Sequence, residues 1–204
     1  MNGHRSVRTF TFTAALLLAL AIYLSALAPQ PVSAREDNSL SPEQISAQLI
    51  EIGTSYQVGD VLSDEDAAFV KAHALSANDA NLQPRGSASV YETRTAYGTS
   101  ARLSGTVWHN GSFNYNFGGN LTGTITSGAT PRSMTVTVFC QPYGIVGSST
   151  VLTYSDSVSQ TSQNSRSVSM SKSKNYSGVA ALYTINSQLD VTTSSGNGFT
   201  INAS

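Results

Sequence analysis

The run from Met134 to Cys140 alternates apolar and polar residues without interruption. Successive side chains of a β-strand point to opposite faces, so this period of two predicts a strand with one buried face. Turn-forming residues precede the run at Pro131 and follow it at Pro142 and Gly144, which bounds the strand at both ends. The residues expected to share the buried face are Met134, Val136, Val138 and Cys140.

The same alternation recurs through residues 86–204, where Ser, Thr, Gly and Asn separate short apolar patterns. Asn110-Gly111 favours a tight hairpin, because both residues tolerate a positive φ. The pattern predicts a mainly β fold, an antiparallel β-sandwich of about eight strands. The strands are expected near residues 88–97, 101–109, 112–126, 132–141, 149–158, 164–174, 177–193 and 198–203.

Residues 1–34 have the layout of a secretory signal peptide. Basic residues come first, an apolar run follows from Ala14 to Leu24, and Val32-Ser33-Ala34 supplies small residues for cleavage. The alternative is an uncleaved membrane anchor, but the run is shorter than the ~20 residues that span a bilayer. We therefore expect a secreted, extracellular protein that begins near Arg35.

Residues 35–85 read as an acidic helical segment that ends in a linker. Ser41 and Gln44 form a capping box around Pro42, and Ser63 opens a second helix that reaches about Leu75. Two helices this short are marginal alone, so we expect them to dock on the β-domain. The apolar residues expected to make that contact are Ile45, Leu49, Ile52, Phe69 and Val70.

The charges divide between these two regions. Residues 35–85 hold nine acidic and three basic residues, whereas residues 86–204 hold three acidic and six basic ones. Opposite net charges favour docking, although exposed pairs contribute only ~0–1 kcal/mol each. Two interpretations stay open: a propeptide that is removed by cleavage near Arg85, or a helical subdomain that is retained.

The β-domain has few groups that could perform catalysis. It holds one cysteine, one histidine and three carboxylates, and no nucleophile or zinc-site motif is present. Cys140 is expected to be a buried structural thiol, and a lone cysteine excludes an intrachain disulfide and multi-cysteine metal sites. Six dispersed basic residues do not suit nucleic acid. We therefore predict a protein that is not an enzyme and uses neither a cofactor nor a metal.

Aromatic residues cluster around the Asn110-Gly111 turn, and a histidine beside such a turn is usually at the surface. Trp108, His109 and Tyr115 are candidate ligand-binding residues if their rings face outward. The alternative is that Phe113, Tyr115 and Phe117 form a core face. An outward aromatic surface flanked by asparagines suits sugars or a partner protein.

Residues 155–174 are rich in serine and low in apolar residues, and they end in two lysines. Such a hairpin is either an exposed edge protected by its cations or an amphipathic pair that enters a membrane. Arg166, Lys172 and Lys174 are the candidate contacts to a membrane or partner. Two functions remain open: a secreted non-catalytic binding module that recognises a surface polymer or protein, and a membrane-active toxin or bacteriocin kept latent by the acidic segment.

Overall fold

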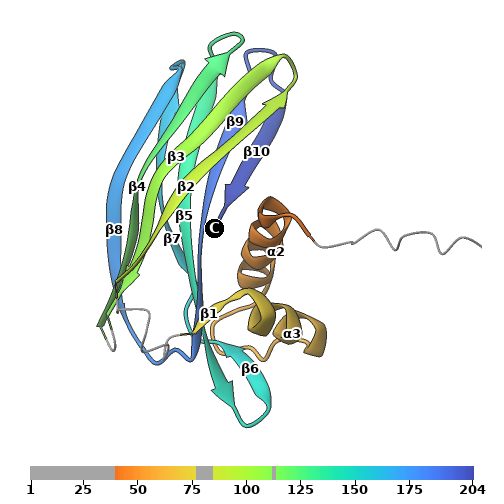
Figure 1. Cartoon of the computed structure of the whole chain (residues 1–204), viewed down its shortest axis with the longest axis vertical. Coiled ribbons are helices and arrows are strands. Elements are labelled where there is room, and N and C mark those ends of the chain that lie inside the picture. Colours follow the sequence, from red (N-terminus) through yellow and green to blue (C-terminus); the bar gives the residue numbers. More distant parts are fainter. Residues whose placement is uncertain (1–39, 77–84, 112–113) are drawn as a thin grey trace, which may run out of the picture. The chain divides into compact units, whose positions relative to one another are not determined.

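The computed structural model describes residues 40–76, 85–111 and 114–204 (Figure 1). The expected signal peptide of residues 1–34 lies outside the described residues, as do residues 77–84 of the expected linker. The described residues form two helices followed by two antiparallel sheets of six and four strands, which confirms the predicted mainly β, sandwich-like fold.

The four-stranded sheet has the order β2-β3-β4-β8. Its first three strands are consecutive hairpins, whereas β8 comes from much later in the sequence and pairs with β4 from Asn114↔Ser177 to Thr124↔Ser167. The four strands are β2 (Arg85–Ala96), β3 (Thr99–Asn110), β4 (Asn114–Ser127) and β8 (Ser167–Ser177).

The six-stranded sheet is organised around β5 (Ser133–Val146), which contains the alternating run. Three strands pair with β5: β6 (Ser149–Leu152), β7 (Asp156–Gln163) and β9 (Leu182–Thr192). The other side of β9 pairs with β1 (Leu75–Ser76) and with β10 (Gly198–Ala203).

The main core lies between the two sheets. Met134, Val136, Val138 and Cys140 are fully buried, as their alternation predicted. They pack with apolar residues of the facing sheet, among them Leu103, Phe117 and Leu121. The glycines of β4 permit close approach, because a Cβ on Gly123 would lie 2.7 Å from a methyl carbon of Leu189.

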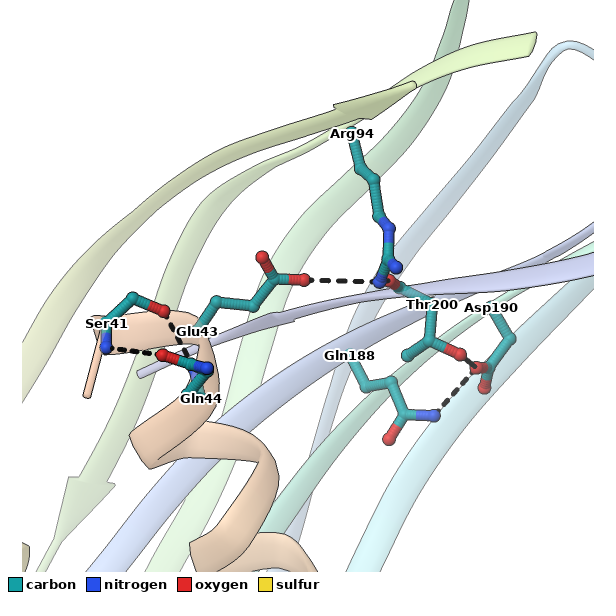
Figure 2. Close-up of polar contacts among 7 residues, drawn as sticks. All are labelled: Ser41, Glu43, Gln44, Arg94, Gln188, Asp190 and Thr200. Carbon is teal, nitrogen blue, oxygen red and sulfur yellow. Dashed lines mark hydrogen bonds and ion pairs between the residues drawn. The ribbon is translucent and has the colours of Figure 1, made fainter. Parts of the chain in front are cut away.

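Both predicted helices are present, α2 (Pro42–Ser55) and α3 (Asp64–His73). Ser41 caps α2 through the predicted capping box, and Figure 2 shows its two hydrogen bonds with Gln44. A second apolar cluster joins the helices to the six-stranded sheet, as the sequence predicted. Its members include Ile45, Leu49, Ile52, Phe69, Val70, Tyr143 and Leu152.

One predicted strand is divided in two. Residues 149–158 form the end strand β6 and the start of β7, because the chain leaves β6 after Leu152. There the backbone N–H of Thr153 donates to the carbonyl of Pro142 at 2.9 Å, and Ser155 binds the carbonyl of Gly53. The prediction also placed the start of β9 five residues too early, at residue 177 instead of Leu182.

Candidate binding surface

The outward face of the four-stranded sheet consists almost entirely of hydroxyl and amide side chains. Residues that alternate with the buried ones point to this face. Arg102 is the single charged residue among the outward positions whose side chains the structure describes, and Arg85 occupies the outward register position opposite Asn110. The outward residues are Ser87, Ser89, Tyr91, Thr93 and Thr95 of β2; Ser100, Arg102, Ser104, Thr106, Trp108 and Asn110 of β3; Asn114, Asn116, Gly118, Asn120, Thr122 and Thr124 of β4; and Ser167, Ser169, Ser171, Ser173, Asn175 and Ser177 of β8.

Side-chain hydrogen bonds link neighbouring strands across this face. The Trp108 indole N–H donates to Asn116 Oδ1 at 2.9 Å, and Asn116 Nδ2 donates to Asn175 Oδ1 at 2.7 Å. Farther along the strands, Ser171 Oγ donates to Asn120 Oδ1 at 2.7 Å. These bonds fix the orientation of the amides, so their remaining donors and acceptors face solvent in set positions.

Two aromatic rings interrupt the polar face. Tyr91 is 66% exposed, and the guanidinium of Arg102 lies 5.7 Å from the centre of its ring. Trp108 is half-buried and has the small residues Ser87 and Gly118 opposite it on the flanking strands. Tyr91 pairs with Ser104, four residues before Trp108 along β3. The two rings are therefore separated by roughly 14 Å along the strands.

A shallow depression of about 410 Å³ lies at the end of β4 and β8. It is lined by Asn114, Tyr115, Asn175, Tyr176 and Ser177. Asn175 also belongs to the hydrogen-bonded row that begins at Trp108. The depression therefore adjoins the polar face, and the outward face, its two rings and this depression together form what we call the sheet-face site.

His109 does not lie at the surface, so the expectation drawn from its place beside the turn is wrong. Only 4% of its area is exposed, and its ring stacks on Tyr183 with centroids 4.1 Å apart. His109 Nε2 is 2.7 Å from the Tyr176 hydroxyl. Burial lowers the pKa of His109 to about 4, because a charged imidazole would lose its hydration there.

The aromatic residues near His109 in the sequence point to different faces of the sheet: Trp108 points outward, whereas Tyr115 and Phe117 point into the core. Tyr115 is 6% exposed and Phe117 is fully buried, which confirms the core interpretation for this strand face. Tyr115 stacks on Tyr176 inside the sandwich, yet it also lines the shallow depression. Of the three candidate ligand-binding residues, only Trp108 lies on the outward face.

Cys140 is a buried thiol, as predicted. Burial raises its pKa far above the ordinary value, and the Tyr176 hydroxyl is its hydrogen-bond partner. Burial also raises the pKa of Tyr176. Both groups therefore stay protonated at neutral pH and contribute to packing rather than to nucleophilic chemistry.

The three candidate cations all have partners within the protein. Arg166 donates to the carbonyls of Gly128 and Ile125, at 2.6 and 3.2 Å. Lys172 and Lys174 reach from β8 to β7, where they contact the carbonyl of Ser159 and the carboxylate of Asp156. These two lysines therefore link β8, an edge strand of the four-stranded sheet, to β7, an edge strand of the six-stranded sheet.

Asp156 accepts several hydrogen bonds at this seam between β7 and β8. Partial burial alone would raise its pKa, but bonds from Lys174, the Ser157 backbone and Tyr154 outweigh that effect and lower the pKa. The ion pair is partly exposed, so we assign it only a small contribution to stability.

Other charged groups in the described part of the chain make contacts between elements. Figure 2 shows that Arg94 joins Glu43 of α2, at 3.5 Å, to the carbonyl of Thr200, while Asp190 accepts from Thr200 and Gln188. No group of three or more potential metal ligands occurs among residues 40–76, 85–111 and 114–204. Arg85, the candidate cleavage residue, begins β2 opposite Asn110.

The sheet-face site could not be identified from the sequence. The alternating Ser, Thr and Asn residues were visible in each strand, but the order β2-β3-β4-β8 brings them onto one surface. The two paired strands β4 and β8 are far apart in the sequence, because β4 ends at Ser127 and β8 begins only at Ser167. No local pattern specifies such a long-range pairing.

No known family model matches the chain, and a search of curated proteins finds no relative. Within the described ranges, no helix has the length and apolar character needed to cross a membrane.

Proposed function

We propose that this protein is a secreted, non-catalytic binding module that recognises an uncharged polymer at a surface, such as a neutral polysaccharide, through the sheet-face site. A protein surface rich in hydroxyl and amide groups is the other ligand that this site suits. The signal-peptide pattern of residues 1–34 supports export.

The single observation that carries the proposal is the chemistry of the outward face. Four adjacent strands present hydroxyls, amides and two aromatic rings, with Arg102 as the one charged residue among the outward positions whose side chains are described. Hydroxyls and amides both donate and accept hydrogen bonds, as sugar hydroxyls do. An aromatic ring provides an apolar platform beside them.

The small number of charged residues on the outward face of the four-stranded sheet disfavours polyanionic ligands. A site for nucleic acid or an acidic polymer contains many cations, because each neutralised phosphate or carboxylate contributes to affinity. Here the neighbouring cations Lys172 and Lys174 contact β7 instead of facing solvent on this surface. An uncharged ligand is the better match.

The membrane-active alternative has less support. Residues 155–174 do not form the expected hairpin, because β7 pairs with β5 and β8 pairs with β4 in different sheets. To enter a membrane as a pair, these two strands would need one apolar face toward lipid. Lys172 and Lys174 alternate onto the same face of β8 as Val168 and Met170. Each lysine at the bilayer midplane would cost ~2–4 kcal/mol. We therefore expect no dye leakage from anionic vesicles, and salt-sensitive leakage would favour the toxin alternative.

Co-sedimentation with insoluble cellulose, chitin and a neutral bacterial wall polysaccharide tests the proposal. We expect retention on at least one of these polymers and a loss of at least tenfold in affinity for Trp108→Ala and for Tyr91→Ser. The matched control is Tyr97→Asn, which removes an exposed ring outside the face at a residue with φ of 51°. Equal weakening by all three variants, or no retention of the wild type on any polymer, would contradict the proposal.

A further inference from the structure

Two short strands, β1 and β10, pair with the same side of β9 and leave a gap between them. On the side away from β5, β10 pairs with residues 187–192 of β9 and β1 pairs with residues 182 and 183. No described strand pairs with that side of residues 184–186. Backbone groups at a sheet edge are strong hydrogen-bonding groups that favour a polar partner.

A cavity of about 340 Å³ lies at this gap. Its apolar walls include Ile45 and Leu49 of α2, Leu75 of β1, Ala88 of β2 and Ile185 of β9. None of the described residues that line it is Asp, Glu, Lys or Arg, although His73 of α3 is one of them. The volume is near the lower end of the ~300–1,000 Å³ that ligand pockets occupy, so it suits a small molecule.

Asn186 supplies a specific polar group in this cavity. It is 1% exposed and lines the cavity, and its Oδ1 accepts a hydrogen bond from Ser46 Oγ at 3.2 Å. Its Nδ2 has no hydrogen-bond partner among the described residues. A buried donor without a partner is destabilising, and a ligand oxygen that accepts from it removes that cost.

We propose that this cavity is a binding site for a small, uncharged molecule with an apolar body and a carbonyl group. The apolar body contacts Ile45, Leu49 and Leu75, while the carbonyl oxygen accepts from Asn186 Nδ2. The described lining offers no Asp, Glu, Lys or Arg as a counterion, which favours an uncharged ligand over carboxylates and amines. This site is separate from the sheet-face site: Ala88, the one residue of β2 in its lining, alternates with the outward residues of that strand.

The test is an NMR titration of the full chain with hexanamide, with hexanoate and hexylamine as charged probes. We expect saturable shifts in α2, β1 and residues 184–186 with hexanamide, and at least tenfold weaker binding of both charged probes. Ala88→Leu fills the cavity and should weaken hexanamide binding at least tenfold. Ala96→Leu, a matched change on the inward face of the same strand, should leave it unchanged.

Asn186→Leu separates the polar contact from the cavity volume. It should weaken hexanamide binding at least fivefold and reduce the preference for hexanamide over n-hexane. If Ala88→Leu fails to fold, Leu49→Phe provides a second way to reduce the cavity from the helix side. Shifts that do not saturate, equal binding of charged and uncharged probes, or equal effects of Ala88→Leu and Ala96→Leu would overturn the proposal.

Discussion

At the scale of single residues, the most informative side chain is His109. Its imidazole stacks against Tyr115 and Tyr183 and lies 2.7 Å from the Tyr176 hydroxyl, and all three tyrosines are almost fully buried. Burial lowers the pKa of His109 to about 4, so the folded protein holds this ring neutral. In the unfolded chain the imidazole binds a proton at a higher pH, near the ordinary histidine pKa of 6.5.

This difference makes stability depend on pH. A lowered folded-state pKa means that the full contribution of His109 is present above about pH 6.5 and is lost as the pH falls toward 4. The loss amounts to roughly 3 kcal/mol. We expect His109→Phe to remove this part of the pH dependence in urea unfolding measured from pH 7 to pH 4. An unchanged pH profile in His109→Phe would contradict the account.

Gly53 is a second residue with a predictable effect. Within a helix, Gly→Ala normally stabilises by ~0.5–1 kcal/mol. Here an added Cβ would lie 2.1 Å from Gln141 Cδ, and Gln141 is fully buried beneath α2. We therefore expect Gly53→Ala to destabilise the protein by ~1–3 kcal/mol in chemical denaturation, since overpacking outweighs helix propensity.

The matched experiment places Gly53→Ala in a Gln141→Ala background. Removing the Gln141 side chain removes the clash, so the same substitution should there be neutral or stabilising. A stabilising effect of Gly53→Ala in the wild-type chain would show that α2 does not pack on Gln141 as described.

At the scale of elements, α2 and α3 are held mainly by apolar contact. Leu49 is 3% exposed and packs in the cluster that contains Tyr143 and Leu152. The one described ion pair between a helix and a sheet, Glu43 with Arg94, is partly exposed on both sides and contributes at most about 1 kcal/mol. Hydrophobic contact therefore outweighs charge in docking the segment.

This ranking predicts the response to mutation and salt. Leu49→Asp should release the segment, because Leu→Ala alone costs ~2–5 kcal/mol at buried positions and a charge adds to that cost. Trypsin should then cut faster after Lys71 and Arg85, as mass spectrometry of timed digests would report. Glu43→Gln or raised salt should change the cleavage rate little. Equal acceleration by Glu43→Gln would mean that charge controls docking.

The elements also show what sequence could predict. The alternation from Met134 to Cys140 predicted β5 and its buried face, and the capping box at Ser41 predicted the start of α2. The burial of His109 followed the same alternation as Val107, two residues before it, but its place beside a turn suggested a surface position. The pairing of β4 with β8 depends on long-range contacts, and so the sheet-face site could not be predicted.

At the scale of the whole molecule, the two outward sheet surfaces differ in what covers them. The six-stranded sheet is partly covered by α2, which buries Gln141, Thr184 and Asn186. No described helix packs on the outward face of the four-stranded sheet, whose residues Ser169, Ser171 and Asn175 are exposed. For this reason we propose the four-stranded sheet, and not the six-stranded one, as the polymer-binding surface.

Site-specific labelling tests this assignment most directly. Cys140 is fully buried, so a maleimide should react only with an introduced thiol. Ser171→Cys on β8 and Thr161→Cys on β7 are matched variants. Each replaces an exposed hydroxyl residue on an edge strand, β8 in the four-stranded sheet and β7 in the six-stranded sheet. Each variant would be labelled with a polyethylene-glycol maleimide and tested for retention on the polymer that binds the wild type. We expect labelling of Ser171→Cys to abolish retention and labelling of Thr161→Cys to leave it intact. Loss of retention only in Thr161→Cys, or in neither variant, would contradict binding through the four-stranded sheet.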